Sequence, residues 1–432
     1  MINQDEESLW AKGLEIVCKL EENGHKAYLV GGCVRDRMLG RSLNDIDIAT
    51  SGRPEDVISL FEKTLPTGLK HGTVTVREDG QSFEVTTFRQ ETGYSDGRRP
   101  DEVLFVQDVK EDLARRDFTF NAMAVGMDGE IVDPFGGQDA LRAGVVACVG
   151  EASERFGEDA LRMLRAIRFA AEFDFLLLPE VWAGILKQRS KLKHVAMERI
   201  SNEWDKMMAG SGPEQACHYL FKSGLLAHVK EELPEAILSA AERYRFNELS
   251  WEWEASLSTV GSLSNDFLQL PLIADVDLRW AALLSGMSAD QETGIEFCRA
   301  LHLSSRRTTR IAEVVGFNEK LSAFEEHELR VGWIKLALAY GSSIAEDWLV
   351  MNEACEEPLF EARGWLEELP ITSVSELKLR GNELSSLLGK SPGPWITTLL
   401  QQLLEEVAFE RVTNEKKSLV SAAKSLVGNL KS

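Results

Sequence analysis

The sequence predicts an α+β N-terminal domain, a small mixed sheet with helices, followed by an all-α remainder. Before about residue 150, short apolar runs alternate with turn residues, which is typical of strands. After that point apolar residues recur at steps of three and four, as on one face of a helix. The chain has 432 residues, 44% of them apolar and 27% charged. It can therefore form cores in two to four domains of about 100–200 residues each.

In the first part of the chain, the expected strands are bounded by turn residues and the expected helices have helical spacing. The predicted strands are residues 27–30, 45–48, 73–76, 83–88, 103–106 and 122–127. Asp79-Gly80 lies between two of these strands and predicts a tight hairpin turn. The predicted helices are residues 7–23 and 34–39.

The remainder of the chain is expected to be helical, with its tryptophans packed in the core. The predicted helices are residues 158–173, 179–188, 200–209, 213–223, 278–284, 306–315, 331–339 and 396–406. Residues 245–275 are rich in Ser, Asn and Trp and predict an irregular connection or insertion.

The net charge limits how this chain could bind nucleic acid. It carries 48 Lys and Arg against 70 Asp and Glu, a formal charge of −22, with the acidity spread over both halves. Phosphate binding needs a positive surface, so a general nucleic-acid coat is not expected. Any such partner must be bound by local basic features. These features are the Arg162–Arg168 stripe, the lysines near the end of the chain, and the group Lys187, Arg189, Lys191, Lys193 and His194.

The cysteine usage and hydropathy predict a cytoplasmic setting with no membrane partner. The six cysteines have no CxxC spacing, which favours free thiols over a disulfide framework or a zinc site. No apolar run approaches the length of about 18 residues that a membrane helix needs.

A first group of polar residues follows the strand that ends near residue 30. Gly31 and Gly32 would let a phosphate approach the backbone, and Arg35 could contact it through two hydrogen bonds. On the next strand, Asp45 and Asp47 would share one face while the intervening isoleucines point to the core. Paired carboxylates near phosphates suit Mg²⁺. Two such ions could activate a hydroxyl nucleophile and steady a leaving pyrophosphate. An isolated Asp-x-Asp would more often be a solvated strand, but the glycines and Arg35 at this spacing favour a metal site.

Two further segments could complete such a site. Glu84 lies on the strand 83–88 and could supply a third carboxylate, although a solvated strand acid is the alternative. Arg115 and Arg116 precede an apolar strand and could bind a triphosphate, and the following Asp117 and Asn121 could orient a ribose or hold a hinge. The alternative for this second segment is a surface cluster of salt bridges.

A third group lies on the predicted helix 158–173. Asp159 and Arg162 would be neighbours at i and i+3, with Arg165 and Arg168 continuing the same stripe. An Asp acceptor beside an Arg donor matches the pairing edges of cytosine and adenine. Uracil and guanine would oppose a donor with a donor, which costs about 1–3 kcal/mol. An ordinary salt-bridged helix face is the alternative.

Taken in this order, the motifs resemble the tRNA nucleotidyltransferase and poly(A) polymerase family, specifically the bacterial class II CCA-adding enzymes. The matching segments read LVGGCVRD, DIDIAT, FEVTTFR, RRDFTFNAMA, DPFGG and EDALRMLRAIRFA, followed by MERI with Glu203 and by GKSPGPWI near the end. The resemblance implies a catalytic head (1–150), a neck that recognises the base (151–205), a body (206–335) and a tRNA-binding tail (336–432).

The resemblance also implies roles for individual residues. Asp45 and Asp47 would bind Mg²⁺ and, with Glu84, carry the catalysis. The residues expected to bind the nucleotide are Gly32, Arg35, Arg116, Asp159, Arg162, Arg165 and Arg168.

The activity implied by the resemblance is template-independent addition of C, C and A to the 3′ end of tRNA, with CTP and ATP as substrates and pyrophosphate as product. Relatives that add only CC have a shortened loop before the RRD motif, and residues 90–103 look full length here. The alternatives are an A-only or CC-only enzyme, a poly(A) polymerase, or a silent RNA-binding module. A homodimer is a further expectation from the resemblance.

Overall fold

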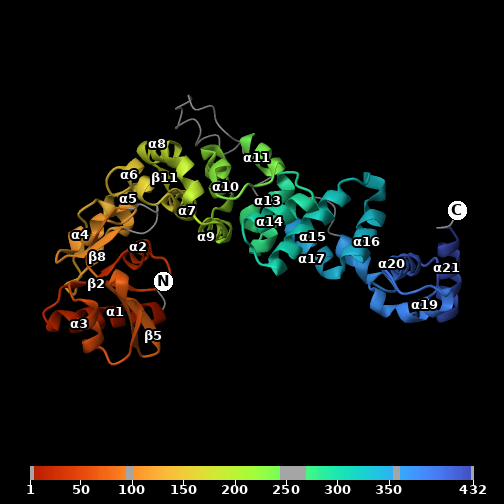
Figure 1. The fold of residues 1–432 in the computed structure, drawn as a ribbon, viewed down its shortest axis with the longest axis horizontal. Helices are drawn as coiled ribbons and strands as arrows, with labels where there is room; N and C mark the ends of the chain where they lie inside the picture. Colours follow the sequence, from red (N-terminus) through yellow and green to blue (C-terminus); the bar gives the residue numbers. More distant parts are fainter. Residues whose placement is uncertain (1–3, 94–100, 244–268, 354–360, 430–432) are drawn as a thin grey trace. The chain divides into compact units, whose positions relative to one another are not determined.

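The computed structural model describes residues 4–93, 101–243, 269–353 and 361–429. The chain divides into two compact units, residues 1–232 and 233–432, which Figure 1 colours from red to green and from green to blue. The predicted division into four domains is finer than these units and stays a prediction.

The first unit contains a mixed seven-stranded sheet with the strand order β3-β4-β5-β2-β1-β8-β9. Strands β2 and β5 pair in parallel, whereas the other neighbouring strands pair antiparallel. The strands are β1 (Ala27–Val30), β2 (Asp47–Thr50), β3 (Thr64–Gly68), β4 (Thr73–Glu78), β5 (Gln81–Thr87), β8 (Ala124–Val125) and β9 (Ile131–Val132).

Helices cover both faces of this sheet. Helices α1 (Gln4–Glu22) and α3 (Pro54–Leu60) pack against one face, as Figure 1 shows. In α1, a Cβ on Gly13 would lie 2.9 Å from Ile46 and 3.1 Å from Leu29, so the absence of a side chain permits the close approach. The opposite face buries a core that includes Val30, Ala49 and Leu113, the last from α4 (Val109–Ala114).

The sequence predicted most of this sheet correctly. Strand β1 has the predicted bounds, and the Asp79-Gly80 turn is confirmed because both residues have positive φ (47° and 82°) between β4 and β5. The strand predicted at 45–48 instead begins at Asp47. The strand predicted at 122–127 is reduced to Ala124–Val125, because a 3₁₀ turn (Thr119–Asn121) precedes it.

Along the chain, a separate pair of strands follows β5 and precedes α4. Strands β6 (Arg89–Thr92) and β7 (Glu102–Phe105) pair antiparallel. The predicted loop 90–103 is thus partly a hairpin, and its central residues 94–100 lie outside the described residues.

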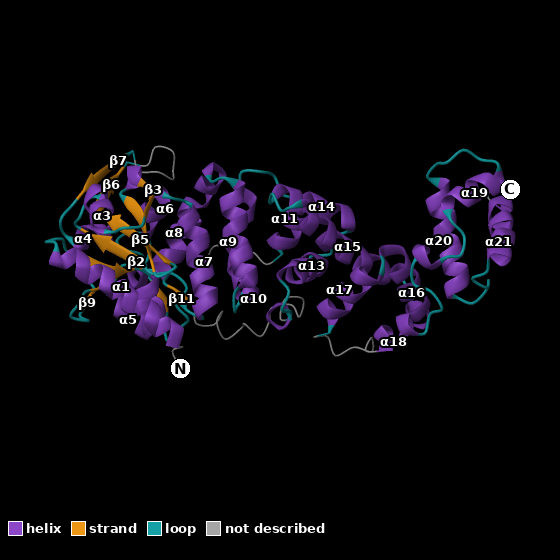
Figure 2. Ribbon diagram, turned by 90° about the horizontal axis from the view of Figure 1, so that it is seen from below, coloured by secondary structure: helices purple, strands orange, loops and turns teal. Residues whose placement is uncertain are grey.

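Helices complete the first unit (Figure 2). The segment predicted as one helix, 158–173, is broken at Asp159, whose backbone is extended (φ −138°, ψ 107°). This correction follows from the Asp159 side chain accepting a hydrogen bond from the Leu161 N–H, a local bond that competes with the helix. The elements are α5 (Gly137–Ala143), α6 (Ala152–Glu158), α7 (Leu161–Phe173), α8 (Pro179–Gln188), α9 (Met197–Ala209), α10 (Pro213–Ser223) and the short parallel pair β10 (Val145–Val146) and β11 (Leu176–Leu177).

In its described residues the second unit contains helices and no strand, as predicted. Helix α15 packs against α13, α14, α16 and α17, and Trp280, Trp333 and Trp348 are buried there. The predicted irregular segment 245–275 lies mostly outside the described residues. The helices are α11 (Glu235–Glu242), α13 (Val276–Gly286), α14 (Gln291–Ala300), α15 (Ser305–Leu321), α16 (Leu329–Tyr340), α17 (Ser342–Asn352), α18 (Ala362–Glu367), α19 (Gly381–Leu388), α20 (Trp395–Ala408) and α21 (Lys416–Asn429).

Across the described residues, every helix is too short or too polar to serve as a membrane span.

Candidate active site

Three carboxylates lie on one face of the central sheet. The parallel pairing of β2 and β5 places Asp47 directly opposite Glu84, and paired residues of neighbouring strands project to the same side. Asp45 lies two residues before Asp47, just outside β2, and its negative charge acts on Asp47. The buried side chains of Ile46 and Ile48 alternate with the two aspartates. Asp45 and Glu84 are exposed and Asp47 is half-buried. The fold therefore brings the three predicted acids to one surface.

The electrostatics of this surface favour a bound cation. Burial raises the pKa of Asp47, the negative charges of Glu84 and Asp45 raise it further, and Arg116 opposes them. Within the described residues, no three His, Cys, Asp or Glu side chains are gathered closely enough to enclose a metal ion. The oxygen donors and their mutual repulsion nevertheless fit a hard divalent cation such as Mg²⁺.

Arg116 reaches this surface because Gly31 has no side chain. Gly31 has a φ of 78°, and a Cβ built there would lie 2.5 Å from Arg116 Nη1. The same Nη1 donates to the Asn121 carbonyl at 3.4 Å. Position 31 therefore requires glycine, because any side chain there would clash with Arg116. At Gly32, by contrast, the nearest side-chain atom lies 3.5 Å from a built Cβ, and the nucleotide contact expected there stays a prediction.

Arg35 makes contacts within the protein. It is 9% exposed, donates to Asn121 Oδ1 at 2.6 Å and to both carboxylate oxygens of Asp36, and lies over the rings of Phe169 and Phe173. Arg35 therefore joins α2 (Gly32–Met38) to α7. Its predicted phosphate contact stays a prediction.

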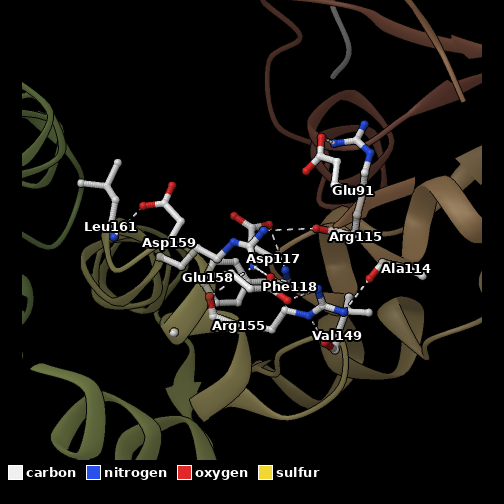
Figure 3. A network of polar contacts seen from close by, with 12 residues as sticks. Glu91, Ala114, Arg115, Asp117, Phe118, Val149, Arg155, Glu158, Asp159 and Leu161 are labelled. Atoms are coloured by element: carbon white, nitrogen blue, oxygen red, sulfur yellow. Dashed lines mark hydrogen bonds and ion pairs between the residues drawn. The ribbon is translucent and has the colours of Figure 1, made fainter. Parts of the chain in front are cut away.

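Asp117, the acid of the RRD motif, ties α7 to the sheet-bearing part of the unit. It accepts hydrogen bonds from the Phe118 N–H (2.9 Å), Asn121 Nδ2 (3.1 Å) and Arg165 Nε (2.7 Å). Burial alone would raise the pKa of Asp117, but Arg165 and Asn121 hold it at about 2. Figure 3 shows Asp117 and Phe118 among the neighbouring polar contacts.

Replacing Asp117 with Asn should destabilise the protein in a pH-dependent way. The carboxylate pKa falls from its usual 3.8 to about 2 on folding, which corresponds to about 2 kcal/mol of stability at pH 7. This stability is present above about pH 4 and is lost as the pH falls towards 2. Urea unfolding at pH 7 and pH 3 should show the deficit of Asp117→Asn shrinking at the lower pH. Asp79→Asn, in an exposed turn, should show no deficit at either pH.

Asp159 and Arg162 are each held by another residue. Asp159 lies in the break before α7 and pairs with Arg199 at 2.7 Å. Arg162 pairs with the Glu158 carboxylate and donates to the carbonyls of Arg155 and Arg115, each at 3.2 Å. The prediction of one continuous helix face is therefore corrected: Asp159 lies in the break before α7, whereas Arg162 lies on α7, which begins at Leu161. The predicted base-reading roles are not tested by these contacts.

Arg155 supports this region and was assigned no role from the sequence. It donates to the Val149 carbonyl at 2.7 Å, to the Ala114 carbonyl at 2.8 Å and to the Glu158 carboxylate at 3.1 Å. Figure 3 shows Arg155 between Val149, Ala114 and Glu158. It thereby joins α6 to the end of α4.

Glu203 on α9 is the second supporting residue without a role assigned from the sequence. It is 4% exposed and accepts from Arg168 Nε at 2.8 Å, with Arg165 Nη1 at 4.0 Å. Burial would raise the pKa of Glu203, but Arg168 and Arg165 lower it. Glu203 lies among the buried residues of α9. A single acid on an otherwise apolar helix face is the pattern in the sequence that could have indicated a buried ion pair.

Comparison with known proteins agrees with this architecture. The family model described as the poly A polymerase head domain matches residues 27–147. A model for a probable RNA- and SrmB-binding site of polymerase A matches residues 174–237, and a putative tRNA nucleotidyltransferase domain 2 matches residues 273–423.

Curated relatives match nearly the whole chain. A CCA-adding enzyme of Bacillus cytotoxicus is 37% identical over 410 residues, covering 94% of this chain and 95% of the relative. One of Geobacillus stearothermophilus is 36% identical over 413 residues with the same coverage. The crystal structure of the Bacillus stearothermophilus CCA-adding enzyme in complex with CTP superposes with a TM-score of 0.76 at 31% identity, covering 98% of each chain.

The sheet with its three acids, followed by helices, defines a nucleotidyltransferase. At 36–37% identity over 94% of its length, the chain belongs to the family of CCA-adding enzymes.

Proposed function

We propose that this chain adds C, C and A to the 3′ end of tRNA without a nucleic-acid template. CTP and ATP supply the nucleotides and pyrophosphate leaves. The observation that carries this proposal is the acid cluster of Asp45, Asp47 and Glu84 on one sheet face, in a chain similar over 94% of its length to CCA-adding enzymes.

Asp45 and Asp47 are the residues that would hold Mg²⁺. Two bound ions would activate the attacking hydroxyl and steady the leaving pyrophosphate. The 3′-oxygen of the tRNA forms a bond to the α-phosphorus as the bond to the bridging oxygen breaks. Glu84 lies on the same face as Asp47 and would accept the proton of the attacking hydroxyl, which is general-base catalysis.

The positive residues near the acids would bind the nucleotide. Arg116 lies beside Asp47 and would contact the phosphates, with Gly32 and Arg35 at the start of α2 completing the site. Arg165 and Arg168 are fixed by Asp117 and Glu203 and would support the base and the triphosphate.

Asp159 and Arg162 would read the base by exchanging their present partners. Asp159 would leave Arg199 to accept from the amino group of C or A, and Arg162 would leave Glu158 to donate to the adjacent ring nitrogen. A uracil or guanine N–H would face the Arg162 donor and leave two donors unpaired.

The tRNA partner would be bound through local positive segments. The 3₁₀ segment Arg189–His194 carries Arg189, Lys191, Lys193 and His194 with no acid, in a chain of net charge −22. Few phosphate contacts should give a shallow dependence of affinity on salt. We further propose a cytoplasmic setting and a homodimer.

Product sequencing tests this function directly. A tRNA transcript lacking its 3′ CCA is incubated with the protein and Mg²⁺, together with CTP alone, ATP alone, or both. We expect two C residues with CTP alone and complete CCA with both nucleotides. Arrest at CC with both nucleotides indicates a CC-only enzyme, addition of A only to a tRNA ending in CC indicates an A-only enzyme, and long A tracts on unrelated RNA indicate a poly(A) polymerase. No addition under any condition would overturn the proposal.

A further inference from the structure

A buried ionic cluster lies where α4 ends and the β6–β7 hairpin begins. It contains three arginines and two acids: Arg89, Glu91, Asp112, Arg115 and Arg116. The side chain of Asp112 is fully buried and that of Glu91 is 8% exposed. The positive charges exceed the negative ones, so the cluster leaves one arginine charge unbalanced.

The two carboxylate oxygens of Asp112 have different surroundings. Oδ1 accepts from the Arg89 backbone N–H at 3.2 Å and from Arg115 Nε at 2.9 Å. Oδ2 is buried, lacks a hydrogen bond within the described residues, and lies 3.6 Å from Arg116 Nη2. Asp112 thus binds Arg115 through a hydrogen bond but interacts with Arg116 through charge alone.

Arg116 interacts with two anions. Its Nη2 lies 3.6 Å from Asp112 Oδ2, and its positive charge lowers the pKa of Asp47. Arg116 Nε is buried without a hydrogen-bond partner in the described part of the chain, and the contact of Nη1 with the Asn121 carbonyl is long, at 3.4 Å. Its guanidinium can therefore shift with a small change in the surrounding charge.

We infer that Asp112 is a positioning residue that holds the Arg116 guanidinium away from Asp47, so that Arg116 can bind nucleotide phosphate. Without the Asp112 charge, Arg116 would move onto Asp47 and form an ion pair that competes with the phosphate. This inference rests on the proposed function, because it assumes a nucleotide beside Asp47. It extends that function to a residue that would not contact the nucleotide.

Equilibrium binding of CTP, measured by isothermal titration calorimetry in the presence of Mg²⁺, tests the inference. Asp112→Asn keeps the size of the side chain and an acceptor for Arg115. It should raise the Kd for CTP about tenfold, as expected if Arg116 loses a hydrogen bond to the charged phosphate. Glu91→Gln loosens the same cluster but leaves the Asp112–Arg116 pair in place, so it should raise the Kd clearly less. Glu111→Gln, an exposed neighbour on α4, should leave the Kd unchanged.

A double variant separates positioning from a general loss of structure. If Asp112 acts through Arg116, Asp112→Asn should have no further effect on CTP binding in an Arg116→Gln background. Additive effects, or equal effects of Asp112→Asn and Glu91→Gln, would overturn the inference. If Asp112→Asn does not melt cooperatively, Asp112→Glu replaces it, since the longer side chain displaces the charge and should weaken CTP binding in the same non-additive way. A parent protein that binds no CTP would instead overturn the proposed function.

Discussion

An Asp47→Asn protein should lose nucleotidyl transfer by at least about 10³-fold and yet be as stable as the parent, or more stable. The rate should fall because Asp47 would hold the metal ion, and metal-ion stabilisation of the transition state is worth several kcal/mol. Stability should not fall, because burial and the charges of Glu84 and Asp45 raise the pKa of Asp47. A raised carboxyl pKa means that the ionised group opposes folding at neutral pH, and the amide removes that cost.

The measurement is single-turnover addition of C to a tRNA lacking its 3′ end, together with thermal unfolding. Asp139→Asn replaces an acid on α5 that is 82% exposed in its side chain, and it should change neither rate nor stability. Full activity in Asp47→Asn would contradict the metal assignment. A large loss of stability would contradict the electrostatic interpretation of this surface.

The acid pair could be predicted from the sequence because the period of a strand is a local property. Alternation of Asp45 and Asp47 with isoleucines predicts one face for both acids wherever the strand lies, although only Asp47 lies within β2. Glu84 was harder to place, because the sequence does not state which strands are neighbours. Strand β5 follows β2 only after β3 and β4, and it is the parallel pairing that sets Glu84 opposite Asp47.

The partners of the arginines could not be predicted, because they come from distant parts of the chain. Arg35 pairs with Asn121 and packs on Phe169, while Asp159 pairs with Arg199. Each contact depends on how helices pack, which a periodic pattern does not specify. The break at Asp159 was missed because acids are also common in the first turn of an unbroken helix, so the pattern around this residue allowed both structures.

The net charge of the chain also says less than the positions of its individual charges. A charge of −22 argues against general nucleic-acid binding. The ion pairs of the structure show, however, that part of this acidity is neutralised locally by arginines. Many acids in the first unit are neutralised by arginines of the proposed site, as Asp117 is by Arg165 and Glu203 is by Arg168. In the proposed function, these acids would hold the arginine side chains in place for a nucleotide.

Replacing Arg162 with Ala should relax the choice of nucleotide more than it slows the reaction. In the proposed role, Arg162 donates to the ring nitrogen of C or A and opposes the N–H of U or G. Removing the donor removes that penalty of about 1–3 kcal/mol, so the preference for CTP over UTP should fall about fivefold to 150-fold. The measurement is the ratio of kcat/KM for CTP and UTP on a tRNA that lacks its 3′ end.

The ratio is informative because Arg162 also has a structural role. Its bonds to Glu158 and to the carbonyls of Arg115 and Arg155 join α7 to α6 and α4, so Arg162→Ala should slow addition of every nucleotide. A purely structural loss would lower the rates with CTP and UTP together and leave their ratio unchanged. Arg142→Ala, which removes an arginine that is 73% exposed on α5, should alter neither the rates nor the ratio. If Arg162→Ala still adds C and A while U remains undetectable, the pairing of this arginine with the base is wrong, and selection must come from another part of the site.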